Sequence, residues 1–295
     1  MPMAQKTFLR ACFLFVAVMV GIVLAGVRSR EAEAADSAVP AYDRLKGGER
    51  ILQEKMYASP EKPTVYLTFD DGPSPYTEEV LDILQEEEIQ ATFFVLGQAA
   101  LQHPEMIQRM VDEGHAVGNH SYDHRYESIY TSFAGFWEQV QKTGDILKRI
   151  AGVETRLLRA PGGTHTNFDP FYFYYLDQAG YAIFDWTIDS GDARRIGVPT
   201  SEIVKNVKNG RLSHEVVLLM HDSGGHAESV KALPEIIRFL KEKGYEFKPL
   251  TSDVRPIHQS PGKPKWNRTY TQEQHQQTME EITGFVKEIS GPVVE

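Results

Sequence analysis

Between residues 64 and 250 the chain alternates short β-branched or aromatic runs with amphipathic helical patterns, and this alternation constrains the fold most. Seven runs are predicted as strands, at 64–69, 91–96, 115–117, 157–158, 181–186, 216–220 and 245–250. Helices are predicted at 77–88, after Pro104, at 133–150, after Pro170, from Ser201 and at 229–243. Repeated strand–helix alternation indicates an α/β fold with parallel strands, either a doubly wound sheet or a barrel. Periodicity alone does not separate the two.

Clusters of polar and titratable residues follow the predicted strands. They read TFDDGP (68–73), GNHSYDH (118–124), RAPGG (159–163), DSGD (189–192) and LMH (219–221). Both candidate architectures place functional residues at the carboxyl ends of their strands. We therefore expect these clusters to meet at one edge of the sheet.

Composition limits the chemistry that these clusters can perform. The chain has 31 Lys and Arg against 41 Asp and Glu, a formal charge of −10, which disfavours nonspecific binding to nucleic acid. Its single cysteine, Cys12, rules out an intramolecular disulfide and a cysteine-rich metal cluster. Any metal ion must therefore be held by His, Asp or Glu side chains.

The first 34 residues resemble a secretory signal peptide. A run that is apolar apart from two glycines, Ala11–Val27, follows Lys6 and Arg10, and Ala32 and Ala34 fit the small-residue pattern of a cleavage site. Cleavage and retention as a membrane anchor are both open, because the run is short for a membrane span. Either outcome predicts a secreted, cell-surface or cell-wall protein.

The remaining boundaries follow from changes in composition. Residues 35–62 are polar and are predicted as a linker or stalk with a short helix at 49–56. A folded domain is predicted over 63–251, and residues 252–295 are predicted as a polar tail whose helical stretch, 271–287, has no evident packing partner.

Each cluster also has an ordinary interpretation when it is taken alone. His120 and His124 are spaced to share one face of a helical turn, as paired zinc ligands do, but such a pair also occurs on surfaces. Asp-Gly-Pro is common turn chemistry, Arg159 fits a surface ion pair, and His221 fits a buried strand end. The order of all five clusters, each after a successive strand, favours a functional site.

This ordered set resembles the polysaccharide deacetylase family, the carbohydrate esterases that share the NodB homology domain. The similarity spans residues 64–250 and rests most on TFDDGP and HSYDH. It implies a distorted (β/α) barrel of about seven parallel strands. It also implies metal-dependent removal of N-acetyl, or sometimes O-acetyl, groups from peptidoglycan, chitin-like polymers or xylan.

The resemblance assigns a role to each matching position. The metal ligands would be Asp71, His120 and His124. The metal would be one divalent ion, most often zinc, although cobalt, nickel and manganese suit such ligands. Asp70 would be the general base that takes a proton from water, and His221 the general acid that protonates the departing amine.

Further positions would support this chemistry. By the same resemblance, Arg159 would pair with Asp70, Asp189 would orient His221, and the backbone N–H of Gly162 would stabilise the oxyanion. Leu219 is assigned to the substrate side of the site.

Two positions depart from the family pattern. Ala193 replaces a tryptophan that usually lines the substrate groove, and Gly162 stands where many relatives have an aromatic residue. Trp186 is the candidate for an alternative wall.

The leading interpretation is an exported hydrolase whose partner is an acetylated glycan, with peptidoglycan favoured. Chitin oligomers and acetylated xylan stay open as substrates, and the oligomeric state is open as well. A glycan-binding relative without turnover is the second hypothesis, although the acid–base set is complete. A metal phosphodiesterase is a third, disfavoured because only one ligand set is evident.

Overall fold

A computed structural model describes residues 40–290 of the chain. The predicted export segment, 1–34, lies outside the described residues. The chain divides into two compact units at the boundary between Glu49 and Arg50. Within the first, helix α2 (Ala41–Lys46) ends at Gly47, and Arg44 forms an ion pair with Glu49. No helix within residues 40–290 has the length and apolar character that crossing a membrane requires.

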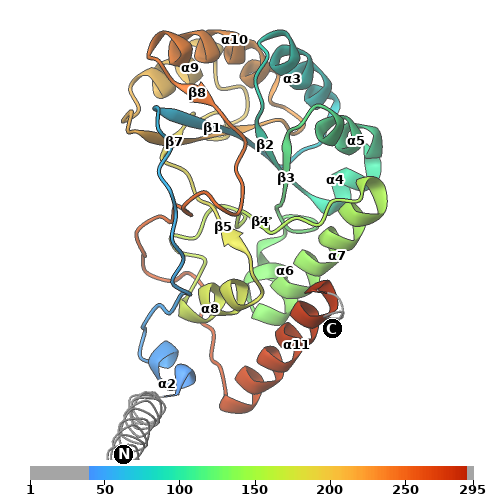
Figure 1. The fold of residues 1–295 in the computed structure, drawn as a ribbon, viewed down its shortest axis with the longest axis vertical. Helices are drawn as coiled ribbons and strands as arrows, with labels where there is room; N and C mark the ends of the chain where they lie inside the picture. Colours follow the sequence, from blue (N-terminus) through green and yellow to red (C-terminus); the bar gives the residue numbers. More distant parts are fainter. Residues whose placement is uncertain (1–39, 291–295) are drawn as a thin grey trace, which may run out of the picture. The chain divides into compact units, whose positions relative to one another are not determined.

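The second unit is built on one sheet of parallel strands (Figure 1). Its strands are β1 (Thr64–Asp70), β2 (Thr92–Val95), β3 (Ala116–Asn119), β4 (Leu157–Leu158), β5 (Ala182–Ile183), β6 (Ile188–Asp189), β7 (Glu215–His221) and β8 (Glu246–Phe247). The order is β5-β4-β3-β2-β1-β7-β6, and β8 pairs with β1. The prediction of an α/β fold, a distorted (β/α) barrel of parallel strands, is confirmed in the form of a curled half-barrel. One predicted strand, 181–186, is corrected: it contains only β5, and β6 follows at 188–189 on the opposite side of the sheet order.

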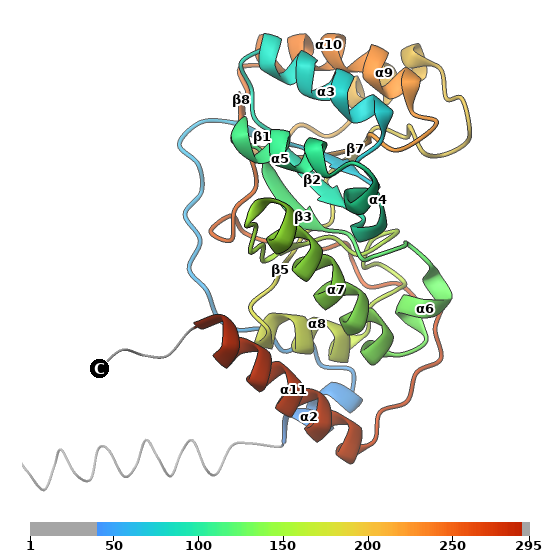
Figure 2. The same cartoon turned by 90° about the vertical axis from the view of Figure 1, so that its right-hand side faces the viewer.

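Helices connect the strands and cover the sheet (Figure 2). They are α3 (Pro75–Glu86), α4 (Gly97–Gln102), α5 (Pro104–Asp112), α6 (Tyr126–Tyr130), α7 (Phe133–Ala151), α8 (Pro170–Gln178), α9 (Thr200–Lys208), α10 (Ala227–Glu242) and α11 (Gln272–Ser290). α3 illustrates how the sequence sets a boundary. Ser74 accepts a hydrogen bond from the backbone N–H of Tyr76, Pro75 occupies the first turn, and Val80, Leu81 and Leu84 form the buried face.

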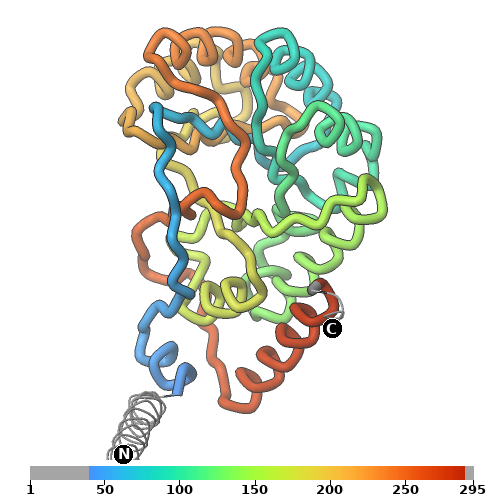
Figure 3. Tube along the Cα trace, in the orientation of Figure 1, coloured from blue at the N-terminus to red at the C-terminus, as the bar shows by residue number. Residues whose placement is uncertain are grey.

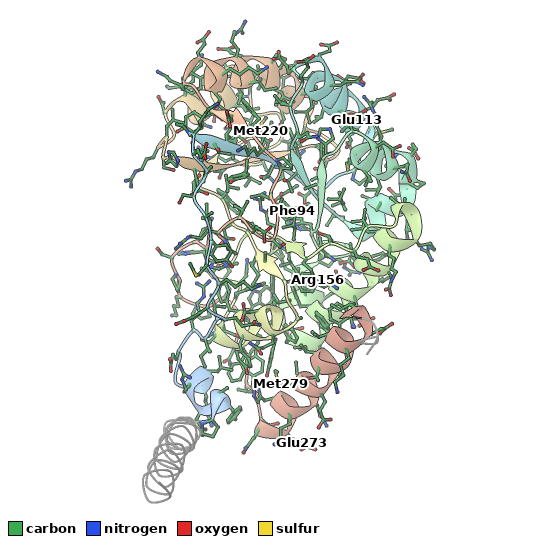
Figure 4. All side chains as sticks on the ribbon, in the orientation of Figure 1. Phe94, Glu113, Arg156, Met220, Glu273 and Met279 are labelled. Atoms are coloured by element: carbon green, nitrogen blue, oxygen red, sulfur yellow. The ribbon has the colours of Figure 1, made fainter. Side chains whose placement is uncertain are left out.

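The two longest strands, β1 and β7, are neighbours in the sheet and carry much of the core. Every residue of β1 is buried, as expected for a parallel strand covered on both faces. Figure 4 labels Phe94 on β2 and Met220 on β7, both within the body of the fold and both fully buried. Glu273, on α11, is exposed. The hydrogen-bonded register of β1 with β7, from Thr64 beside Glu215 to Asp70 beside His221, fixes their positions relative to each other.

Strand register brings the clusters to the carboxyl edge of the sheet. Asp70, the last residue of β1, lies beside His221, the last residue of β7. Asn119, which precedes the histidine pair, lies at the end of β3 beside Leu158 of β4. The expectation that the clusters share one edge is therefore confirmed for these strands.

The C-terminal segment, residues 252–290, is not a free tail, which corrects the prediction. Figure 3 traces it from β8 past the loop before α8 to α11. The N–H groups of Gly262 and Lys265 bond the carbonyls of His165 and Thr166 in that loop. On α11 the ring of Phe285 lies 5.0 Å from that of Trp137. The pattern appeared unpartnered because its partners are distant in sequence.

The predicted helix at 49–56 is also absent. Residues 51–60 carry no helix, and the preceding Gly47 and Gly48 end α2. The backbone N–H and side-chain amide of Gln53 donate to Asp177 on α8 instead, and the Arg50 guanidinium lies 3.6 Å from the Phe173 ring centroid. These contacts hold the segment against α8 in an extended form and not as a helix.

We predict that α11 contributes to stability. Ile282 is 1% exposed, so Ile282→Ala should lower the free energy of unfolding by about 2–5 kcal/mol in chemical denaturation. Glu280→Ala, an exposed change on the same helix, should alter it by less than about 0.5 kcal/mol. Equal values for Ile282→Ala and the unchanged protein would contradict the packing described.

Candidate active site and metal centre

Three side chains converge at the carboxyl edge of the sheet as a candidate metal centre. The Oδ1 atom of Asp71 lies 3.3 Å from Nε2 of His120 and 3.5 Å from Nε2 of His124. Oδ1 is buried and has no hydrogen-bond partner among residues 40–290. One oxygen and two imidazole nitrogens facing a common point form a donor set that suits a divalent transition metal.

The histidine pair reaches this point through a loop and not through a helical turn, which corrects the predicted local structure. Ser121 and His124 have left-handed backbones, with φ of 70° and 60°, and Asp71 has φ of 71°. These are three of the four non-glycine residues with positive φ that the structure records between residues 40 and 290. Such conformations cost about 1–3 kcal/mol each and concentrate at functional sites. Three of these costly backbone conformations therefore occur at or next to the candidate metal ligands.

Neighbouring groups fix the orientation of the first histidine and of the loop. His120 is 2% exposed, and its Nδ1 bonds the carbonyl of Arg159 at 2.9 Å, which leaves Nε2 directed at Asp71. Two side chains of α7 hold the loop: Thr143 donates to the carbonyl of Ser121, and Gln139 accepts from the N–H groups of Tyr122 and Asp123. The bond from Nδ1 of His120 to a backbone carbonyl is typical of histidines that bind a metal ion through Nε2.

The protonation states also fit a bound cation. Burial alone would raise the pKa of Asp71, but the close approach and charge of His120 and the charges of His124 and His221 lower it well below its usual range. Burial, followed by the charge of His120, lowers the pKa of His124. Metal ligands must be an ionised carboxylate and neutral imidazoles. The directions of the Asp71 and His124 shifts therefore suit ligands of a divalent metal ion.

Asp70 lies beside this cluster and is held by a buried arginine. Arg159 is fully buried, and its Nη1 donates to Oδ1 of Asp70 at 2.8 Å and to Oγ1 of Thr68 at 2.6 Å. The other carboxylate oxygen, Oδ2, lies 3.8 Å from Nε2 of His120. The ion pair thus leaves one oxygen of Asp70 directed at the cluster, where it can accept a proton.

The carboxylate that orients His221 is Asp192, and the prediction of Asp189 is corrected. Oδ1 of Asp192 lies 2.8 Å from Nδ1 of His221, and Oδ2 accepts from the His221 backbone N–H and from Ser229. Asp189 is exposed and accepts from the N–H of Gly191. Asp189 ends β6, and the chain then turns at Gly191, with φ of 71°, to bring Asp192 to the histidine.

The contact with Asp192 raises the pKa of His221. Burial lowers the pKa of His221, but the hydrogen bond and charge of Asp192, with the charges of Asp70 and Asp71, raise it to about 9. The imidazole is therefore protonated at neutral pH. Because Nδ1 is bonded to Asp192, the proton available for transfer is on Nε2.

The predicted oxyanion donor, Gly162, lies in the turn that follows β4 and Arg159. Gly162 and Gly163 both have positive φ, 70° and 77°. Asn167 donates to the carbonyls of Pro161 and Gly163 and accepts from the Trp266 indole N–H, so the C-terminal segment supports this turn. This support was not predicted, because Trp266 is about a hundred positions from Asn167.

The two residues assigned to the substrate side lie near these groups. Trp186 is half-buried, with its ring 5.9 Å from the Arg159 guanidinium, and a Cβ on Gly163 would stand 2.9 Å from it. Leu219 is buried in β7 beside Thr68 and Asp189.

Sequence reasoning did not single out one further carboxyl group, that of Asp222. It is fully buried directly after His221, and Thr77 of α3 donates to its Oδ2. Burial, as the main cause, raises its pKa to about 7. A Cβ on Gly72 would stand 2.3 Å from the carboxylate oxygens of Asp222. Only glycine, which has no Cβ, therefore fits at position 72 of the Asp-Asp-Gly turn. Asp222 thus links the end of β7 to the turn that carries Asp71.

We predict that the pKa of His221 depends on Asp192. In metal-free protein it should be about 9 by NMR titration, and Asp192→Asn should lower it by one unit or more. Because this pKa lies above the unfolded value of about 6.5, the pair stabilises the fold fully below pH ~6.5 and loses its contribution as pH rises towards 9.

Asp189→Asn serves as the matched control and should leave the His221 titration unchanged. A larger pKa change in Asp189→Asn than in Asp192→Asn would contradict the assignment of Asp192.

Comparison with known proteins shows which family the chain belongs to. A model of the polysaccharide deacetylase family matches residues 57–183. A peptidoglycan-N-acetylglucosamine deacetylase of Bacillus cereus is 36% identical over 191 residues, 63% of this chain and 69% of that protein.

Solved structures agree with this match. The catalytic domain of a peptidoglycan N-acetylglucosamine deacetylase from Eubacterium rectale has a TM-score of 0.64 and 32% identity, and covers 70% of this chain and 96% of that one. A mutant of a carbohydrate esterase family 4 pseudoenzyme with restored activity has a TM-score of 0.58 and 28% identity, over 67% of this chain and 70% of that one. The chain belongs to the polysaccharide deacetylase family, carbohydrate esterase family 4.

Proposed function

We propose that this protein is a metal-dependent hydrolase that removes N-acetyl groups from peptidoglycan. The observation that carries the proposal is the pairing of Asp70 and His221 at the ends of adjacent strands, next to the Asp71, His120 and His124 cluster. Asp70 forms an ion pair with Arg159, and His221 forms a separate ion pair with Asp192. Separate environments of this kind distinguish a general base from a general acid.

The chain's own residues account for the proton transfers of amide hydrolysis. A divalent cation bound by the cluster would supply Lewis-acid chemistry towards the acetyl carbonyl and the attacking water. Asp70 accepts the proton of that water through Oδ2, the oxygen that Arg159 leaves free. His221, charged through Asp192, donates its Nε2 proton to the departing sugar amine. The Gly162 N–H donates to the oxygen on which negative charge develops.

Peptidoglycan is proposed as the substrate because the Bacillus cereus and Eubacterium rectale relatives are named as acting on it. Chitin oligomers and acetylated xylan are the alternatives. We also propose zinc as the metal, since two imidazoles and a carboxylate suit it.

Export to the cell surface is part of the same proposal. It rests on the sequence of residues 1–34, which places an apolar run between a basic start and a small-residue cleavage pattern. A polymeric wall substrate requires such a location.

The test measures acetate release from peptidoglycan, chitin oligomers and acetylated xylan. Chelation should reduce the rate by about 100-fold or more, and added zinc should restore it. Asp71→Ala should stay inactive with or without zinc, because it removes a ligand. The exposed helix variant Asp145→Ala is the matched control and should behave like the unchanged protein.

Three outcomes would contradict parts of the proposal. Full activity after chelation would contradict metal dependence, and greatest activity on xylan would contradict N-deacetylation of peptidoglycan. If none of the three polymers released acetate, hydrolysis itself would be contradicted, and a glycan-binding role without turnover would replace it.

A further inference from the structure

Helix α6 directs two tyrosines, one helical turn apart, at the turn that contains Gly162. The ring centroids of Tyr126 and Tyr130 lie 5.8 Å apart. Tyr130 is fully buried, and its hydroxyl donates to the carbonyl of Pro161 at 2.8 Å. Tyr130 therefore supports the turn from inside the fold, and Tyr126 approaches it from the exposed end of the same helix.

The Tyr126 hydroxyl lies directly against Gly162. A Cβ on Gly162 would stand 2.5 Å from the hydroxyl oxygen and 3.3 Å from Cζ of the same ring. Gly162 also has φ of 70°, which disfavours any side chain there. The phenol of Tyr126 thus occupies the space that a side chain on Gly162 would need.

The same ring borders the metal cluster. The centroids of Tyr126 and His124 lie 5.2 Å apart, and Nε2 of His124 lies 3.5 Å from Asp71. The ring of Tyr126 therefore lies beside one of the candidate metal ligands, and its hydroxyl lies against the turn that carries the predicted oxyanion donor. No other tyrosine in the described residues is recorded in contact with both His124 and Gly162.

The hydroxyl is available for a substrate. Tyr126 is 40% exposed, and the structure gives its hydroxyl no hydrogen-bond partner within residues 40–290. By contrast, the hydroxyls of Tyr130 and Tyr172 both donate to backbone carbonyls. A phenol is a strong donor, and one that ends unpartnered beside reacting groups can bond whatever occupies the site.

We propose that the Tyr126 hydroxyl donates a hydrogen bond to the acetyl oxygen of the substrate, next to the Gly162 N–H, and is a catalytic residue. The inference rests on the proposed deacetylase function. No bond to Tyr126 forms or breaks, and its proton stays on the hydroxyl. Because the acetyl oxygen gains negative charge as water attacks, this hydrogen bond strengthens in the transition state and accelerates the reaction.

The test compares Tyr126→Phe, which removes only the hydroxyl, with Tyr126→Ala, which removes the ring as well. Tyr126→Phe should lower kcat by about 100-fold, the typical loss for one oxyanion donor, and leave KM within about twofold. The matched control is Tyr245→Phe, which removes a hydroxyl that donates to the Ser213 carbonyl and should leave kcat unchanged.

A binding measurement provides a readout that does not depend on turnover. Acetate should bind zinc-loaded Tyr126→Phe about tenfold more weakly than zinc-loaded unchanged protein in calorimetry, because one hydrogen bond to a charged oxygen is lost. The affinity for zinc itself should be the same in both proteins, since Tyr126 is not one of the ligands.

The outcomes separate this role from the proposed function. If the unchanged protein is active and Tyr126→Phe matches it in kcat, the catalytic role is overturned. If only Tyr126→Ala is impaired, through a raised KM, Tyr126 is a sugar-contacting wall and the role is again overturned. If the unchanged protein releases no acetate, the deacetylase function is overturned and the role of Tyr126 with it.

Discussion

A buried arginine holds together the strands from which the site is built. Arg159 follows β4, and its guanidinium bonds Asp70 at the end of β1, Thr68 within β1 and the carbonyls of Phe184 and Asp185 beyond β5. Its own carbonyl accepts from His120, after β3. Removing one partner of a buried ion pair typically costs about 3–5 kcal/mol, because the other charge is left unpaired. The fold and the geometry of the candidate site therefore depend on the same side chain.

Around this arginine the charges are divided into separate pairs. Asp70 is opposite Arg159, and His221 is opposite Asp192, with both pairs largely buried. Within the described residues Asp71 forms ion pairs only with the histidines of its own cluster, and its Oδ1 has no hydrogen-bond partner there. A buried carboxylate oxygen without a partner is costly. A bound cation would satisfy it, which is why the cluster and not the acid–base pair is the candidate metal centre.

Local sequence patterns predicted the features that depend on short stretches of chain. The strands β1, β2 and β7 and the clusters that follow them are local, because apolar runs and turn residues define them. The choice between Asp189 and Asp192 was not local: it depends on the β6–β7 register and on the left-handed Gly191. The left-handed Ser121 and His124 likewise have no signature in the spacing of two histidines. The packing of residues 252–290 depends on partners that are mostly about a hundred or more residues away.

The most direct test of the account is the position of the metal ion. Crystals of zinc-loaded protein should show, by anomalous scattering at the zinc edge, one ion about 2.0–2.2 Å from an oxygen of Asp71 and from Nε2 of His120 and His124. A second group of potential ligands, Asp192, His221 and His226, lies nearby. An ion found only at that second group would contradict the account, because it would occupy the residues assigned to acid catalysis.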